Sequence, residues 1–136
     1  MDDILKTMRI SGAGMRVQGE RLRVIAQNLA NASSLPQDPG GKPYRRQVIT
    51  FKNQLDRALG LKTVRVSKIG LDRSAFGKRY EPDHPAADVD GYVLTPNVNT
   101  LIEMTDMREA QRSYEANLSV IKASKAMLNQ TIDMLR

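Results

Sequence analysis

Two stretches, one at each end of the chain, repeat apolar residues at alternating steps of three and four. In the first stretch, positions 4 to 29 carry six apolar residues at eight such positions: Ile4, Met8, Met15, Leu22, Ile25 and Leu29. In the second, positions 104 to 135 carry eight apolar or aromatic residues at ten positions: Met104, Met107, Tyr114, Leu118, Ile121, Leu128, Ile132 and Leu135. This spacing is typical of helix seams. We therefore expect long N- and C-terminal helices paired as a coiled coil, with these residues at subunit interfaces.

The N-terminal helix is expected to be weak when isolated. Two aspartates after Met1 favour its start, and a turn-forming stretch that reaches Pro36 ends it. Gly12, Gly14 and Gly19 lie inside it, and each costs about 1 kcal/mol relative to Ala. Small residues also allow a second backbone to approach closely. The helix therefore requires a partner.

The C-terminal helix has a clearer start. Thr100 to Glu103 has the form of a capping box, and Asn99 is an alternative cap. Four alanines add a second face of small residues: Ala110, Ala116, Ala123 and Ala126. Two apolar faces on one helix imply more than one neighbour.

The middle of the chain predicts a small β-containing insert in a mainly α protein. Residues 36–43 are rich in proline and glycine and cannot form a helix. Short strands are expected at 44–51, 62–69 and 91–94, a helical turn at 53–59, and an extended segment at 80–85. The predicted segments are therefore an N-terminal helix at 1–32, a middle β and loop region at 33–98, and a C-terminal helix at 99–136.

Basic residues outnumber acidic ones in this chain. The net charge is +6 and the isoelectric point is about 9.8. Only four cations cluster, Lys42, Arg45, Arg46 and Lys52, and no helix or groove motif accompanies them. These cations are therefore more consistent with a solvated or interface-lining strand than with a nucleic-acid-binding site, and we predict no binding to nucleic acid. The chain has no cysteine, no membrane-spanning stretch and no segment of the signal-peptide type.

The sequence contains only incomplete versions of the patterns typical of enzymes and metal sites. His84 lies near three aspartates, but an EF-hand frame centred on Gly91 places Ala86 first and Asn97 twelfth. Ser119 to Lys122 matches a serine acylase pattern, yet it lies in the middle of a helix without companion motifs. We therefore expect no catalytic residues, no metal site and no cofactor.

Particular motifs resemble a known family. Residues 18–32 (QGERLRVIAQNLANA) resemble the motif shared by the rod and hook axial proteins of the bacterial flagellum. The remaining motifs, in their order and spacing, are similar to those of proximal rod proteins: 80–82, 84–88, 91–93, 96–99, 103–104 and 112–117. The resemblance implies a structural subunit of the proximal rod, a helical tube that crosses the periplasm and transmits torque from the motor.

The same resemblance implies a set of partners and a route of export. The partners would be further copies of the chain, the rod proteins FlgB, FlgF and FlgG, the adaptor FliE and the flagellar type III export apparatus. Export would take place without a cleaved signal peptide, and no direct insertion into a membrane is expected. A soluble helical-bundle adaptor or chaperone remains the alternative from the residues alone.

Overall fold

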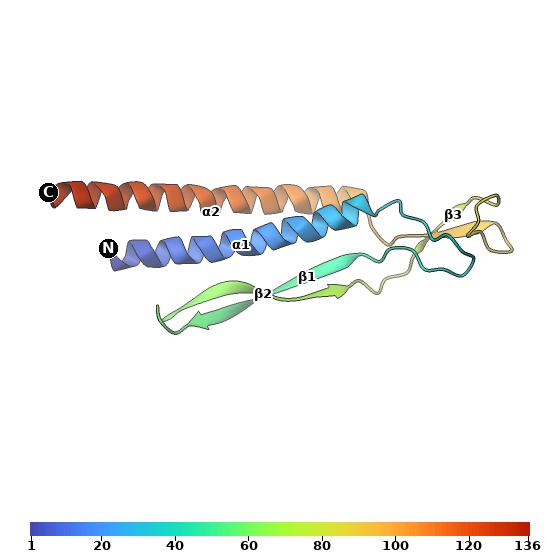
Figure 1. Ribbon diagram of the computed structural model, residues 1–136, viewed down its shortest axis with the longest axis horizontal. Helices are drawn as coiled ribbons and strands as arrows, with labels where there is room; N and C mark the ends of the chain where they lie inside the picture. The colour runs from blue at the N-terminus through green and yellow to red at the C-terminus, as the bar shows by residue number, and fades with distance from the viewer. The chain divides into compact units, whose positions relative to one another are not determined.

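Two long helices flank four strands along the chain (Figure 1). The computed structural model describes all 136 residues, from Met1 to Arg136. The elements are α1 (Asp2–Ala30), β1 (Gln47–Asp56), β2 (Leu61–Leu71), β3 (Gly77–Tyr80), β4 (Tyr92–Thr95) and α2 (Thr100–Met134). Strand β1 pairs with β2, and β3 pairs with β4. These elements confirm the prediction of terminal helices around a middle region of short strands.

The start of α2 is set by Asn99. Its side-chain Oδ1 accepts hydrogen bonds from the backbone N–H groups of Leu101 at 3.1 Å and Ile102 at 3.4 Å. These two donors have no partner within the helix, which is why an asparagine is favoured at this position. Of the two caps that the sequence offers, the structure uses Asn99, and the carboxylate of Glu103 has a different role.

The helical turn predicted at 53–59 is wrong. Residues 53 to 56 continue β1, and a tight turn follows. Oδ1 of Asp56 accepts hydrogen bonds from the N–H groups of Ala58 at 3.0 Å and Leu59 at 3.3 Å. Gly60 closes the turn with a φ of 65°, and its N–H donates to the carbonyl of Asp56 at 2.9 Å. The aspartate and glycine thus form a hairpin turn where local propensity suggested a helix.

The chain forms two units, each with its own internal contacts. Unit 1 comprises residues 1–22, 49–68 and 108–136, and unit 2 comprises 23–48 and 69–107. The buried residues of unit 1 include Ser11, Val17, Ala110 and Ser124, and those of unit 2 include Val24, Ile25, Asn28, Val93 and Glu103. Each unit takes residues from all three segments expected from the sequence, so the three-segment division stays a prediction.

In unit 2, β3 and β4 form an antiparallel hairpin. Its register pairs Gly77 with Thr95 at one end and Tyr80 with Tyr92 at the other. The two tyrosine rings pack edge to face, with centroids 5.3 Å apart. Between the strands, the carboxylate of Asp88 accepts hydrogen bonds from the backbone N–H groups of Asp90 and Tyr92, both at 2.9 Å. These bonds order the loop from within.

Candidate functional site

The two helices contact each other in unit 1 through small and polar residues. A Cβ atom on Gly14 would lie 2.9 Å from Nδ2 of Asn117, so the absent side chain permits this approach. Nη2 of Arg21 lies 3.5 Å from Oε2 of Glu109. By contrast, a Cβ on Gly12 or Gly19 would meet no atom within 4 Å. Close packing therefore accounts for one of the three helix glycines.

The structure places the predicted seam residues of the two helices differently. In α1, Ile25 is buried and the other five are half-buried: Ile4, Met8, Met15, Leu22 and Leu29. In α2, five are half-buried: Met107, Tyr114, Leu118, Ile121 and Leu128. Met104, Ile132 and Leu135 are exposed. The structure contains no neighbouring copy, so the assignment of these residues to subunit interfaces stays a prediction.

The buried face of α2 includes a row of small and polar residues that the apolar pattern does not identify. Its members recur every seven residues, and none is exposed. Glu103, Ala110 and Ser124 are buried, and Asn117 and Thr131 are half-buried. A search for large apolar residues misses this row, although its constant spacing is visible in the sequence. Large apolar residues of α2 consequently remain exposed: Leu101, Ile102, Met104, Val120, Met127, Ile132 and Met134.

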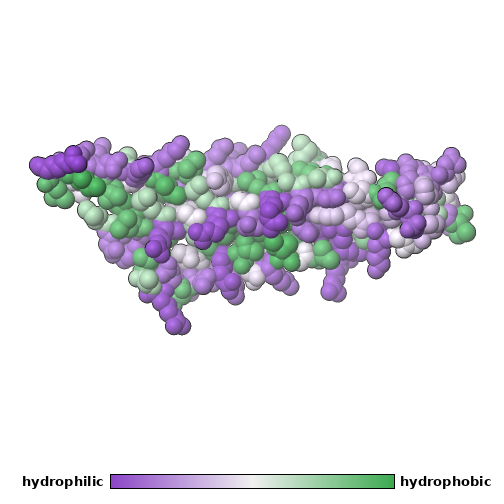
Figure 2. All heavy atoms as spheres, viewed as in Figure 1, coloured by the Kyte–Doolittle hydropathy of each residue, from purple (hydrophilic) through white to green (hydrophobic).

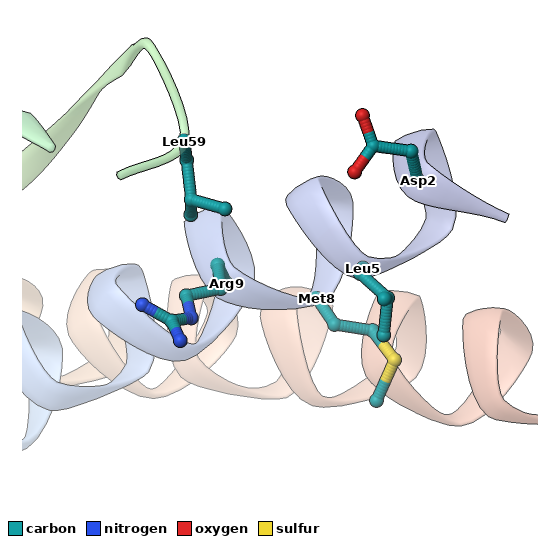
Figure 3. Close-up of a pocket in the computed structure, with 5 residues that line it drawn as sticks. All are labelled: Asp2, Leu5, Met8, Arg9 and Leu59. Atoms are coloured by element: carbon teal, nitrogen blue, oxygen red, sulfur yellow. The ribbon is translucent and has the colours of Figure 1, made fainter. Parts of the chain in front are cut away.

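The surface of unit 1 carries four of these apolar side chains among charged ones: Val120, Met127, Ile132 and Met134. In Figure 2, hydrophobic atoms reach the surface along the helices between hydrophilic atoms. Met127 is 55% exposed and Met134 is 86% exposed. A cavity of about 350 Å³ lies between the first turns of α1 and the turn of the β1–β2 hairpin. Figure 3 shows Leu59 of that turn directed toward α1, with Leu5 and Met8 on the neighbouring helical turns.

A different kind of interior lies in unit 2, where Asn28 near the end of α1 is only 1% exposed. Its Nδ2 donates to the carbonyl of Gln47 at 2.9 Å, and its Oδ1 accepts from the N–H of Gln47 at 2.9 Å. The carboxamide thus pairs with both backbone groups of the first residue of β1. Oδ1 also accepts a hydrogen bond from the hydroxyl of Tyr44 at 2.7 Å.

Glu103, in the first turn of α2, is the second buried polar residue of this region and is 1% exposed. Its Oε1 accepts a hydrogen bond from Nε of Arg46, and its Oε2 lies 3.4 Å from Nδ2 of Asn28. Arg46 also reaches Oδ2 of Asp72 at 3.4 Å and Oδ2 of Asp106 at 3.9 Å. A buried charge is tolerated only when it is paired and hydrogen-bonded, and this one is both.

Asn97 completes the region from the segment before α2. Its Oδ1 accepts from the backbone N–H of Arg46 at 2.7 Å, and its Nδ2 donates to the carbonyl of Asp72 at 3.0 Å. Arg45 donates to the same carbonyl at 2.8 Å, and its guanidinium lies 4.1 Å from the centroid of the Phe76 ring. We call this set the polar joint: Asn28, Tyr44, Arg46, Asp72, Asn97 and Glu103.

The electrostatics of the polar joint follow from these contacts. Hydrogen bonds from Ser74, followed by the guanidinium of Arg46, lower the pKa of Asp72. Burial and the nearby charge of Glu103 raise the pKa of Tyr44. Burial alone would lower the pKa of Arg46, but its hydrogen bond and attraction to Glu103 outweigh this, so the pKa is raised. The guanidinium of Arg46 therefore stays charged across the ordinary pH range.

The polar joint connects chain segments, and its geometry is that of a structural element. Every buried side-chain nitrogen and oxygen has a hydrogen-bond partner, so none is left directed at a ligand. Two of the four clustered cations in the 42–52 stretch, Arg45 and Arg46, are engaged within the chain. No group of three or more potential metal ligands is found, and neither helix is long and apolar enough to cross a membrane.

Comparisons with known proteins agree with the resemblance noted in the motifs. A family described as flagellar basal body rod FlgEFG protein, C-terminal, matches residues 89–134. The chain is 48% identical over 136 residues to the flagellar basal-body rod protein FlgC of Agrobacterium fabrum, covering 100% of this chain and 98% of the relative.

Two more distant relatives carry the same name. The FlgC protein of Salmonella typhimurium is 38% identical over 133 residues, covering 96% of this chain and 97% of the relative. That of Borreliella burgdorferi is 36% identical over 151 residues, covering 98% of each. Identity at this level along nearly the whole length of both chains shows common family membership. The chain therefore belongs to the FlgC family of flagellar basal-body rod proteins.

Proposed function

We propose that the chain is a structural subunit of the proximal rod, which assembles with further copies and other rod proteins into a helical tube that transmits motor torque. The main observation that supports this proposal is the exposed apolar face of α2, which includes Ile102, Val120, Met127 and Met134. Several large exposed apolar residues on one helix indicate a protein partner. The family membership supplies the identity of the assembly.

In this assembly, the terminal helices pair as coiled coils, within the chain and with neighbours. The predicted seam residues and the exposed face of α2 supply two contact surfaces on one helix. Burying them would contribute about 25 cal/mol per Å² of apolar surface before the entropy of association is subtracted. Resistance to torque then comes from the sum of many interhelical contacts, because no single one is strong.

Ordering of unit 1 is coupled to assembly in this proposal. The large side chains at its surface, such as Met127 and Met134, gain apolar contacts only when a neighbour covers them. Gly12 and Gly19 weaken α1 without any packing role in the single chain. A helix that is marginal alone passes more easily through an export channel and then gains order from its neighbours.

The partners and location follow from the same proposal. Neighbouring subunits would be FlgB, FlgF and FlgG, with FliE as the adaptor. The rod would span the periplasm after export through the flagellar type III apparatus without a cleaved signal peptide. No catalytic activity, nucleic acid or membrane insertion is part of this function.

Charge substitutions on the helices test the seam. We expect Leu22→Asp, Leu118→Asp and Leu128→Asp to abolish rod assembly, because each places a carboxylate among half-buried apolar residues. Gln130→Asp, at an exposed position of α2, is the matched control and should leave motility unchanged. Normal motility in all three leucine variants would refute the seam assignment.

A deletion strain tests the function itself. Electron microscopy of its basal bodies should show that the rod is missing, and an intact rod would contradict the proposal. Light scattering and far-ultraviolet circular dichroism of the purified chain separate this function from a bundle adaptor. An adaptor would be a stable monomer or small closed oligomer with both helices formed, whereas a rod subunit should have partly unfolded ends or polymerise.

A further inference from the structure

The β1–β2 hairpin carries a set of unpaired cations. Five basic residues on this hairpin are exposed and form no ion pair within the chain: Lys52, Arg57, Lys62, Arg65 and Lys68. The only acidic residue on it, Asp56, lies 3.5 Å from Nη1 of Arg9 on α1. Leu55, between these cations, is 54% exposed. We call this hairpin the basic hairpin; it combines exposed positive charge with an exposed apolar residue.

The loop between β3 and β4 has the opposite charge. Residues 81–91, the acidic loop, carry four carboxylates and no lysine or arginine: Glu81, Asp83, Asp88 and Asp90. The carboxylates of Asp83 and Asp90 are exposed and form no hydrogen bond or ion pair within the chain. Val89 in this loop is fully exposed, and the tyrosine pair at the base of the loop, Tyr80 and Tyr92, is also exposed. The loop thus combines negative charge with apolar and aromatic surface.

We propose that the basic hairpin of one copy binds the acidic loop of a second copy in the assembled rod. This inference rests on the proposed function, because it requires neighbouring copies. Two features of the chain favour this occupant. The carboxylates complement the cations, and the exposed side chains of Val89 and the tyrosine pair match the exposed Leu55.

The net charge gives a second reason for self-recognition. Each copy carries +6, so two copies repel each other at long range unless regions of opposite sign meet. Contact between the acidic loop and the basic hairpin converts this repulsion into local attraction. A nucleic acid or an anionic lipid surface would satisfy the cations but would leave Val89 and the tyrosine pair uncovered.

The contact joins two different surfaces of the same chain. Each bound copy therefore still offers an unoccupied basic hairpin or an unoccupied acidic loop to the next copy. Such heterologous contacts produce open helical assemblies or rings, whereas contacts between identical surfaces produce closed dimers. The geometry suits a subunit of a helical tube.

Single-cysteine chains provide a direct test, because the native chain has no cysteine. Asp90→Cys and Lys62→Cys are produced on separate copies in the same flagellated cells, and basal bodies are isolated and oxidised. We expect a disulfide-linked dimer only when both variants are present. Replacing Lys62→Cys by Lys122→Cys, an exposed lysine on α2, should lose the dimer and is the control.

The outcomes of this test are distinct. If both single-cysteine chains are present in basal bodies and no dimer forms, the docking proposal is overturned and the rod function stands. If the unmodified chain itself is absent from basal bodies, the rod function fails, and the docking proposal fails with it. A monomeric disulfide in a chain that carries both cysteines would show contact within one copy and would also overturn the proposal.

A charge exchange gives a second readout that does not depend on cysteine chemistry. Lys52→Glu with Arg65→Glu, or Asp83→Lys with Asp90→Lys, should each reduce the number of complete rods about tenfold. A chain with all four substitutions regains opposite charges and should recover to within about twofold of the unmodified chain. The proposal would be overturned if the fourfold variant failed to recover, or if either double variant formed rods at the normal number. It would also be overturned if the only effect of the double variants were a loss of binding to anionic vesicles or to duplex DNA.

Discussion

The two units of the chain are stabilised by different interiors. In unit 2, the interior contains the buried amide of Asn28 and the buried carboxylate of Glu103, and every buried polar atom has a partner. In unit 1, the buried residues are mostly small, such as Ser11, Ala110 and Ser124, and none is charged. Large apolar residues lie at the surface of both units, for example Met127 in unit 1 and Leu101 in unit 2.

The difference separates what one copy can specify from what an assembly must supply. A satisfied network of directional hydrogen bonds favours one geometry, because any rearrangement leaves buried polar groups unpaired. Apolar surface is not directional and accepts any complementary neighbour. We infer that unit 2 sets the arrangement of its helix ends in a single copy, whereas unit 1 reaches full stability only with neighbours.

The largest effect is expected from breaking the buried ion pair. Glu103→Leu leaves Arg46 without its main partner in the polar joint and should lower the free energy of unfolding by about 3 kcal/mol. Near-ultraviolet circular dichroism during urea unfolding measures this, because Tyr44, Tyr80 and Tyr92 belong to unit 2. Glu109→Gln removes the exposed partner of Arg21 and should cost less than about 1 kcal/mol. Equal losses in the two variants would contradict the comparison.

The next largest effect is expected from removing the carboxamide that binds β1. Asn28→Ala leaves the N–H and carbonyl of Gln47 without these partners and should cost about 2 kcal/mol in the same unfolding measurement. Asn31→Ala is the control, since the side chain of Asn31 bonds only to local groups near the helix end. A neutral Asn28→Ala would show that the polar joint does not determine the stability of unit 2.

Two glycines sharpen the description of unit 1. In Gly19→Ala, the added Cβ would meet no atom within 4 Å. The substitution should stabilise α1 by about 1 kcal/mol and thereby raise the helix content of the isolated chain. Gly14→Ala gains the same propensity, but its Cβ would displace the amide of Asn117, so the net gain should be smaller. Far-ultraviolet circular dichroism compares the two variants. A larger gain for Gly14→Ala would contradict close packing at that site.

The smallest effect is expected from titrating Asp72. Its pKa is lowered from the ordinary value of 3.8 in the folded chain, so its stabilising contribution is fully present above that value. The contribution is lost as the pH falls through the lowered pKa. The difference in unfolding free energy between the unmodified chain and Asp72→Asn should therefore shrink on acidification below about pH 4. An unchanged difference down to pH 2 would exclude this linkage.

Much of the architecture could be predicted because it follows from local pattern. Repeated apolar residues at steps of three and four indicate helices whatever the partner, so both long helices were predicted close to their observed ends. Strand positions are predicted less accurately, and at 53–59 the local pattern favours a helical turn where the structure has the end of β1 and a hairpin turn. Its true form depends on the pairing of β1 with β2, which distant residues decide.

The polar joint could not be predicted, for a physical reason. From the sequence, Arg46 belongs to a stretch that suggests a cluster of surface cations, and Glu103 fits the last position of a capping box. Only the fold brings the two together with Asn28 and converts solvated groups into a buried pair. Similarly, the apolar pattern of α2 does not reveal that small and polar residues at 103, 110 and 124 are buried while Met104 and Ile132 are exposed.

The sequence by itself determined the two helices, the insert between them and the family, because periodicity and motifs are properties of local order along the chain. The tertiary structure alone decided which face of each helix is buried and which charges are paired. Burial and ion pairing depend on segments that are distant in sequence, and their energies arise only when those segments meet.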